Sequence, residues 1–262
     1  MNILETIVAH KKLEIARQKL LHSIADLETA QLFNRNTLSL KKFLLDETRT
    51  GIIAEYKRKS PSKGNINTIS TVQEVTMAYA QSASGISVLT DNEFFGGNAA
   101  DLLHARVNQV PILRKDFMVD PYQIIEAKSI GADVILLIAA CLTVQEVKQF
   151  AALAKGLGLE VLLEIHNEEE LAHICTDIDF VGVNNRNLKT FEVSIDTSLQ
   201  LINKIPTEML AIAESGISNV DTIVTLHQAG FKGFLIGENF MKEPDPAIAF
   251  ANFVEKLKTK LG

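Results

Sequence analysis

Short, apolar, β-prone runs recur eight times from Ile52 onward, at intervals of about twenty to thirty-five residues. They are Ile52–Lys57, Ile86–Thr90, Pro111–Asp116, Asp133–Ala139, Glu160–Ile165, Phe180–Asn185, Met209–Ser215 and Gly233–Gly237. The stretches between them, such as Val144–Lys155 and Val220–Ala229, mix apolar and charged residues as surface helices do. Eight strand–helix repeats whose strands are apolar on both faces predict an α/β fold, the closed parallel (βα)8 or TIM barrel.

A doubly wound open sheet is the competing topology. The sequence shows no GxGxxG after the first strand and no midpoint where the strand order would reverse. Gly85, Gly131, Gly158 and Gly230 each come just before a strand, where a preceding helix is expected to end in a left-handed residue. The barrel is therefore the favoured prediction.

The first 49 residues do not follow this rhythm. Ile3, Leu4, Ile7 and Val8 recur at helical spacing, an apolar stripe continues to Ile24, and Phe43 and Leu44 predict a further short helix. We therefore expect residues 1–49 to form an N-terminal helical extension packed on a barrel of residues 50–262, one structural domain overall. The extension is expected to cover one end of the core, and a partner-binding arm is the alternative.

Charge and cysteine content narrow the function classes. The net charge is −6 and the pI about 5.6, which argues against nucleic-acid or membrane-surface binding. Cys141 and Cys175 lie far apart and predict reduced thiols in a cytoplasmic protein. The longest apolar run, Val134–Leu142, is too short to span a bilayer, and the six scattered His without HExxH predict no metal site.

Polar residues cluster at the ends of the predicted strands. Glu55 and Lys57 lie two apart, so they share one face of the first strand. Active sites of this fold lie at the C-terminal ends of the strands, where Lys115, Glu164 and Glu214 also fall. A solvated strand end explains any one of these charges, but so many converging from different strands favour an acid–base site.

Glycines and a small-residue loop predict a phosphate site. Gly216 and Gly237 follow the seventh and eighth strands, where this fold commonly binds phosphate through backbone N–H groups. The loop around Ser60 after the first strand adds a hydroxyl and a flexible backbone, and Lys57 lies nearby. Together they suggest a monoester phosphate held mainly by neutral donors, which agrees with the acidic chain.

Several stretches carry a more specific pattern. They are IIAEYKRKSPSKG at 52–64, SVLTD…FFGG at 87–97, PILRKDF at 111–117, LLEIH at 162–166, GVNNRNLKTFEV at 182–193, AESGIS at 213–218 and FLIGENFM at 234–241. In this order they closely resemble the indole-3-glycerol phosphate synthase family. ETIVAHKKLEIARQK near the N-terminus resembles the helical segment that this family carries before its barrel. The resemblance covers essentially the whole chain.

The resemblance implies a reaction of tryptophan biosynthesis, in which 1-(2-carboxyphenylamino)-1-deoxyribulose 5-phosphate closes to indole-3-glycerol phosphate with loss of carbon dioxide and water. Such an enzyme is a carboxy-lyase, and no cofactor is expected because the anilino nitrogen accepts positive charge. By resemblance Lys115 is the general acid, which Glu55 would help keep protonated. Glu164 is the expected base and Lys57 a second acid, with the division between the two lysines left open.

Binding roles follow from the same resemblance. Ser60, Gly216, Gly237 and Glu238 resemble phosphate-binding positions, with Glu238 acting through its backbone and its side chain expected to point away. Asn184, Glu214 and Ser215 resemble residues that hold the ribulose hydroxyls and the catalytic groups, and Arg186 one that stabilises a loop or the substrate carboxylate. Phe95, Phe117 and Leu136 are expected to form an apolar slot for the anthranilate ring, over which the N-terminal helix would help close the barrel mouth.

Two other functions compete. One is another phosphate-binding barrel isomerase, but such enzymes need an Asp/Cys or Asp/Asp pair, which Lys115 and Glu164 do not supply. The other is a non-catalytic barrel that binds a sugar phosphate, which gives no reason to keep two acids opposite two lysines. The expected partner is a small-molecule sugar phosphate bearing an anthranilate ring, bound by a monomer without nucleic acid or membrane.

Overall fold

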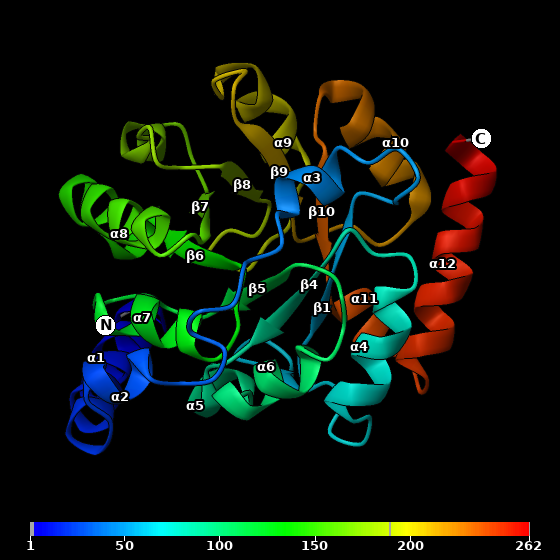
Figure 1. The fold of residues 1–262 in the computed structure, drawn as a ribbon. Coiled ribbons are helices and arrows are strands. Elements are labelled where there is room, and N and C mark those ends of the chain that lie inside the picture. Colours follow the sequence, from blue (N-terminus) through cyan, green and yellow to red (C-terminus); the bar gives the residue numbers. More distant parts are fainter. Residues whose placement is uncertain (1–2, 189, 262) are drawn as a thin grey trace.

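The structure, a computed structural model, describes residues 3–188 and 190–261, and it contains a closed barrel of eight parallel strands (Figure 1). Residues 1–2, 189 and 262, which the predicted extension and barrel include, lie outside the described part. The strands are β1 (Ile52–Tyr56), β4 (Gly85–Leu89), β5 (Ile112–Lys115), β6 (Val134–Ile138), β7 (Glu160–Ile165), β8 (Phe180–Asn184), β9 (Leu210–Glu214) and β10 (Gly233–Ile236). β1 closes the barrel by pairing with both β4 and β10. The predicted (βα)8 barrel is confirmed.

Helices surround the barrel and return the chain from one strand to the next (Figure 1). They are α4 (Val72–Ala80), α5 (Asn92–Phe95), α6 (Ala99–Ala105), α7 (Tyr122–Ser129), α8 (Val144–Gly156), α9 (Asp196–Leu201), α10 (Val220–Ala229), α11 (Glu238–Met241) and α12 (Pro246–Leu261). Short 3-10 turns lie at η1 (Ala139–Cys141), η2 (Glu169–His173) and η3 (Ile202–Lys204), and a small hairpin pairs β2 (Lys59–Ser60) with β3 (Gly64–Asn65). Capping boxes at Thr71 and Thr143 begin α4 and α8. None of the described helices is both long and apolar enough to cross a bilayer.

Two apolar layers hold the barrel together. One lies between the strands and the outer helices, and the other fills the barrel interior with side chains such as Ile53, Leu113, Leu162 and Phe180. Because both faces of each strand are covered, the strands are buried almost throughout, which explains why they appear as unbroken apolar runs in the sequence.

The extension contains helices α1 (Ile3–Leu21), α2 (Ile24–Glu28) and α3 (Leu40–Leu44), so the expectation of helix up to residue 49 is only partly right. Residues 29–39 are turns and coil, because barrel carboxylates bind the end of this segment in place of a helical backbone partner. Oδ1 of Asp133 accepts the Leu38 N–H at 2.7 Å, and Oε2 of Glu160 accepts the Leu40 N–H at 2.6 Å.

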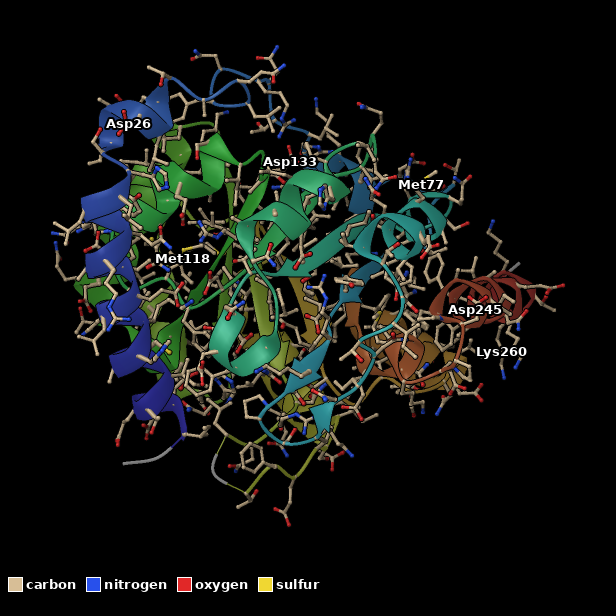
Figure 2. All side chains as sticks on the ribbon, turned by 90° about the horizontal axis from the view of Figure 1, so that it is seen from below. Asp26, Met77, Met118, Asp133, Asp245 and Lys260 are labelled. Atoms are coloured by element: carbon tan, nitrogen blue, oxygen red, sulfur yellow. The ribbon has the colours of Figure 1, made fainter. Side chains whose placement is uncertain are left out.

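The extension reaches both ends of the barrel, whereas the sequence predicted one. Leu40 and Leu44 of α3 join the interior apolar cluster at the N-terminal end of the strands. Figure 2 shows α1 (dark blue) running along the side of the barrel, with the labelled Asp26 and Asp133 toward the end of the barrel where α1 finishes.

Three of the four glycines expected to end a helix have the left-handed backbone. Gly131, Gly158 and Gly230 have φ of 89°, 76° and 120°. Gly85 does not, and lies inside β4. A Cβ there would lie 2.8 Å from Cδ1 of Leu40, so this glycine makes room for α3 instead.

Candidate active site

Two adjoining pockets open at the C-terminal ends of the strands. The main pocket is lined by Glu55, Lys57, Ser60, Phe95, Lys115, Phe117, Leu136, Glu164, Asn184, Arg186, Glu214, Ser215 and Glu238, together with apolar residues of α1 and of the neighbouring loops. The side pocket shares several of these residues and adds Gly216 and Gly237. The structure therefore brings every residue predicted from the sequence to this end of the barrel.

Lys115, at the end of β5, lines the main pocket and binds two carboxylates. Its Nζ donates to Oε2 of Glu164 at 2.9 Å and to Oε2 of Glu214 at 2.5 Å. Burial lowers the pKa of Lys115, but the carboxylates of Glu164, Glu214 and Glu55 more than offset this and raise it. The amine is thus held protonated, although Glu164 and Glu214 contribute more than Glu55, the residue expected from the sequence.

The two carboxylates bound to Lys115 differ in their affinity for protons. Burial raises the pKa of Glu164, yet Lys115 and His166 outweigh it and hold that pKa well below the usual range. Burial raises the pKa of Glu214 to about 7, because the attraction of Lys115 is opposed by the nearby charge of Glu164. One acid is therefore ionised, while the other titrates near neutral pH.

Glu55 of β1 and Lys57, which directly follows the strand, form a second acid–base pair. Nζ of Lys57 lies 2.8 Å from Oε1 of Glu55, and the Ser87 hydroxyl donates to the other oxygen at 3.4 Å. A Cβ on Gly237 would lie 2.6 Å from Oε1 of Glu55. Gly237, predicted as a phosphate residue, therefore also makes room for this carboxylate.

Gly182 on β8 makes room for the Glu214 carboxylate in the same way. It was not among the site residues predicted from the sequence. A Cβ there would lie 2.3 Å from Oε1 of Glu214. A glycine in the middle of a predicted strand is a signal of such close approach, and GVNN carries it.

Asn184 and its neighbours organise the loop after β8. Nδ2 of Asn184 donates to Oε1 of Glu164 at 3.2 Å, while its Oδ1 accepts the Arg186 N–H at 3.0 Å. The buried Asn185 donates to the carbonyl of Ser215 at 3.2 Å and accepts from the Ser198 hydroxyl at 2.8 Å. Asn185 thus supports the loops of the site from behind.

His166 is a further residue that the sequence analysis missed, although it ends the LLEIH stretch. Its Nε2 lies 3.3 Å from Oε1 of Glu164, and its Nδ1 lies 3.3 Å from Oε2 of Glu170. Burial lowers the pKa of His166, but the two carboxylates reverse this and raise it to about 10. The protonated imidazole of His166 therefore lies next to the Glu164 carboxylate, just after β7, the strand that carries Glu164.

An apolar wall faces this polar cluster. The rings of Phe95 and Phe117 lie 6.0 Å apart between centroids, and Leu136 lines the same pocket. The first turns of α1 contribute further apolar side chains, and the loop after β8 contributes Leu188 and Phe191. Ile3, Leu4 and Ile7 are the pocket residues of α1. Their helical spacing was visible in the sequence, but it did not indicate which surface they would line.

The side pocket is lined by Ser215, Gly216, Gly237 and the start of α11, with cationic side chains at its edge. Ser215 and Gly216 both have left-handed backbones, with φ of 65° and 76°. The carboxylate of Glu238 lies 3.7 Å from Lys63 and 3.7 Å from Arg186, two residues of the pocket lining. This carboxylate therefore lies beside two cations of the side pocket, and the expectation that it points away from the phosphate stays a prediction.

Across the described residues, no group of three or more His, Cys, Asp or Glu is placed to hold a metal ion. Cys141 and Cys175 are free thiols and take no part in the cluster.

The fold and the site define this chain as a TIM-barrel protein with a buried lysine–glutamate cluster at the C-terminal end of its strands. It belongs to the indole-3-glycerol phosphate synthase family, whose profile, described by that name, matches residues 4–253. An indole-3-glycerol phosphate synthase from Bacteroides thetaiotaomicron is 44% identical over 259 residues, spanning 98% of this chain and 99% of the relative. One from Verminephrobacter eiseniae is 40% identical, spanning 95% of this chain and 98% of the relative. The family predicted from the sequence is confirmed.

Solved structures of other proteins share the fold. A chain of the tryptophan synthase complex from Pyrococcus furiosus is 17% identical with a TM-score of 0.61, covering 81% of this chain and 99% of its own. Orotidine 5'-monophosphate decarboxylase from Sulfolobus solfataricus is 12% identical with a TM-score of 0.60, covering 82% of this chain and 100% of its own. At these identities the likeness shows the barrel alone.

Proposed function

We propose that this chain is a carboxy-lyase of tryptophan biosynthesis. It converts 1-(2-carboxyphenylamino)-1-deoxyribulose 5-phosphate to indole-3-glycerol phosphate, releasing carbon dioxide and water. The observation that carries the proposal is the position of Lys115, held protonated between Glu164 and Glu214 beside an apolar wall with two aromatic rings. A protonated amine next to an aromatic slot is what ring closure of this substrate requires.

In ring closure, the ring carbon that bears the carboxylate forms a bond to the ketone carbon, and the ketone oxygen becomes a hydroxyl. Lys115 supplies the proton for that oxygen. Decarboxylation then breaks the bond to the carboxylate carbon and restores aromaticity, with the anilino nitrogen accepting positive charge in between. The side chains of the cluster orient the substrate during this step, and the apolar wall keeps water away from the ring.

Dehydration needs a base to remove a proton and an acid to assist the departing hydroxyl. In the resting site Glu164 is a weak base, because Lys115 and His166 lower its pKa. Once Lys115 has given up its proton, one of these charges is gone and the pKa of Glu164 rises. We assign Glu164 as the base at that stage, with Lys57 as the second acid and Glu55 as the carboxylate that orients it.

Substrate binding divides between the two pockets. Phe95, Phe117 and Leu136 take the anthranilate ring, while Asn184 and Ser215 face the ribulose hydroxyls. The backbone of Gly216, Gly237 and Glu238 takes the phosphate in the side pocket, with the hydroxyl of Ser60 on the adjoining loop. Arg186 lines both pockets and supplies a cation to the substrate carboxylate or to the loop.

The proposal extends to the setting of the enzyme. Residues 1–49 and 50–262 act as one unit, because α1 lines the pocket and α3 fills the opposite end of the barrel. The chain acts as a monomer in the cytoplasm, where Cys141 and Cys175 stay reduced. Its partner is the small-molecule substrate, and no nucleic acid or membrane is involved.

The test is the appearance of indole fluorescence when the purified chain meets the carboxyphenylamino-deoxyribulose phosphate, with a chelator present and no cofactor added. Prompt product formation that depends on Lys115 is the expected result. If no product forms while inorganic phosphate still displaces a bound substrate analogue, the chain is a sugar-phosphate-binding barrel without this activity.

A further inference from the structure

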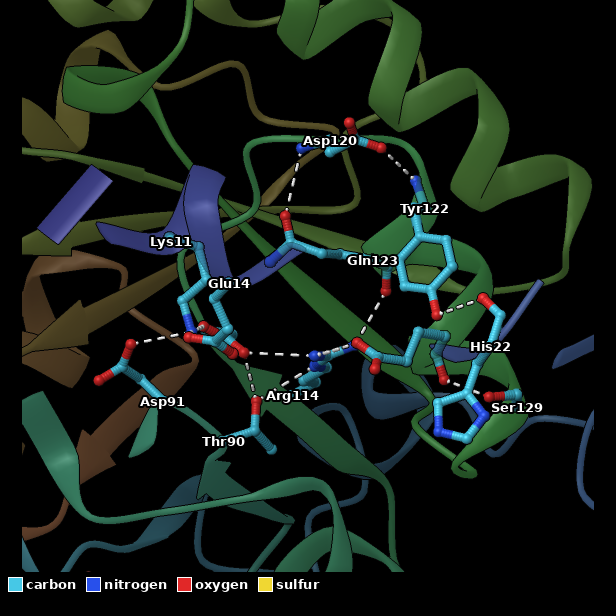
Figure 3. Close-up of polar contacts among 12 residues, drawn as sticks. Lys11, Glu14, His22, Thr90, Asp91, Arg114, Asp120, Tyr122, Gln123 and Ser129 are labelled. Carbon is cyan, nitrogen blue, oxygen red and sulfur yellow. Dashed lines mark hydrogen bonds and ion pairs between the residues drawn. The ribbon is translucent and has the colours of Figure 1, made fainter. Parts of the chain in front are cut away.

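A buried ammonium group joins α1 to the loops that follow β4 and β5. The Lys11 side chain is 0% exposed, and its Nζ lies 2.8 Å from Asp91, 3.1 Å from Asp116 and 2.9 Å from Glu14. Figure 3 shows Lys11, Glu14 and Asp91 at one end of a polar network that continues through Arg114 to Gln123 and Tyr122. Charges buried this fully are costly unless they are paired, so Lys11 and its carboxylates depend on one another.

Two of the three carboxylates that Lys11 contacts, Asp91 and Asp116, also fix part of the pocket wall. Asp91 is the N-cap of α5, and its Oδ1 accepts the Phe94 N–H at 2.7 Å, one residue before Phe95 of the ring slot. Asp116 lies between Lys115 and Phe117 in the sequence, and its Oδ1 accepts the Phe117 N–H at 2.8 Å. The position of Lys11 is therefore linked to the general acid and to both aromatic residues.

The second oxygen of Asp116 extends the network behind β5. It accepts from the Thr90 hydroxyl at 2.7 Å and from Nη2 of Arg114 at 3.3 Å. Arg114 also donates to the carbonyl of Gln123 at 2.9 Å, and the Gln123 amide donates to the carbonyl of Phe117 at 2.9 Å. The loop after Lys115 is thus tied on one side to the barrel and on the other to α1.

We propose that Lys11 is a positioning residue of the active site, which holds the segments bearing Phe95, Lys115 and Phe117 beneath the first turns of α1. Ile7, one helical turn before Lys11, lines the main pocket, so the same helix supplies a wall and fixes its geometry. The inference rests on the proposed function and deepens it, because it gives the extension a part in placing the general acid.

The chain offers a matched control at the other end of the barrel. Nη2 of Arg35 lies 2.6 Å from Oδ1 of the fully buried Asp133. Asp133 also pairs with Arg106, so it still has one cationic partner when Arg35 is replaced. This arrangement parallels Lys11 and Asp116, where Arg114 is the remaining cation. Like Lys11, Arg35 ties the extension to the barrel through a buried aspartate, but neither Arg35 nor Asp133 lines either pocket.

The test compares Lys11→Met with Arg35→Met in the full chain, using kcat and KM from indole fluorescence well below the unfolding temperature of each variant. We expect K11M to lower kcat by about ten- to a hundredfold and to raise KM, because the general acid and the ring slot are displaced together. R35M should keep both parameters near wild type despite its lower stability. Lys11→Arg, which retains the charge, should recover part of the lost kcat.

If K11M fails to fold, Asp91→Asn replaces it, because the asparagine oxygen can still cap α5 while the ion pair with Lys11 is lost. A folded K11M or D91N whose kcat and KM match the wild type, or an R35M that loses as much kcat as they do, would overturn the role of Lys11. If the wild-type chain forms no product, the proposed function fails and this role falls with it. That result is distinct from an active wild type with equally active variants.

Discussion

Adding a side chain at Gly182 gives the sharpest test of the site geometry. A Cβ at this position would lie 2.3 Å from Oε1 of Glu214 and 3.1 Å from Cδ1 of Leu162. Since carbon and oxygen rarely approach closer than about 3.3 Å, Gly182→Ala must push the carboxylate away by about 1 Å. Glu214 binds Lys115 through its other oxygen, so the displacement acts directly on the general acid.

We expect G182A to lower kcat by about a hundredfold, because a misplacement of about 1 Å at a catalytic group has a cost of that order. Its free energy of unfolding should fall by about 1–3 kcal/mol, the usual effect of overpacking a filled core. Indole fluorescence at saturating substrate measures kcat, and urea unfolding measures the stability of the same preparation.

Gly156→Ala is the matched control. Gly156 is the last residue of α8, and a Cβ there meets no atom within 4 Å. This variant should retain wild-type kcat, with an unfolding free energy unchanged or raised by up to about 1 kcal/mol. A folded G182A whose kcat stays within about twofold of wild type would refute the reasoning, because Glu214 would then tolerate a displacement of about 1 Å.

Three further predictions concern charged groups of the site. Lys115→Met should lower kcat by about 10²–10⁴-fold, the usual contribution of a general acid, and near wild-type turnover would exclude that role. His166→Gln tests whether the protonation of His166 contributes to folding stability. Because the pKa of His166 is raised from 6.5 to about 10, its charge stabilises the folded wild type fully below about pH 6.5 and progressively less as the pH rises toward about 10. The stability difference between wild type and H166Q in urea unfolding should therefore shrink across this window, and a constant difference would contradict it. Glu238→Gln should tighten binding of inorganic phosphate by about two- to fivefold, because it frees Lys63 and Arg186 from a partly exposed carboxylate, and phosphate inhibition of turnover measures this. Unchanged or weaker phosphate binding by E238Q would mean that Lys63 and Arg186 do not face the bound phosphate.

The barrel could be predicted from the sequence because its strands satisfy a local rule. Each is covered on both faces, so each appears as an apolar run, and every predicted strand begins and ends within one residue of the observed one. The acid–base cluster could be predicted once the barrel was, since a closed parallel barrel brings the C-terminal ends of all its strands to one face. Glu55, Lys115, Glu164 and Glu214 needed only their position at the strand ends to be grouped.

The break in the extension was not predictable by the same means. The carboxylates that bind its backbone belong to Asp133, just before β6, and to Glu160 of β7, about a hundred residues later in the chain, and no local periodicity encodes a contact of that range. Local propensity favoured a helix through residues 29–39, and the tertiary contacts with the barrel overruled it.

The same limit applies to proton affinities within the site. Glu164 and Glu214 both end a strand with a carboxylate, and nothing in either segment distinguishes an ionised acid from one that titrates near pH 7. The difference arises because Glu164 has a second cation in His166, whereas for Glu214 burial and the charge of Glu164 outweigh the attraction of Lys115. His166 thus lowers the pKa of one carboxylate beside the general acid, an effect that the strand pattern does not encode. The chemistry of the barrel mouth therefore depends on residues behind the substrate-facing groups: His166 adds a charge beside Glu164, Gly182 leaves room for Glu214, and in our proposal Lys11 positions the segments that bear the general acid and the ring slot.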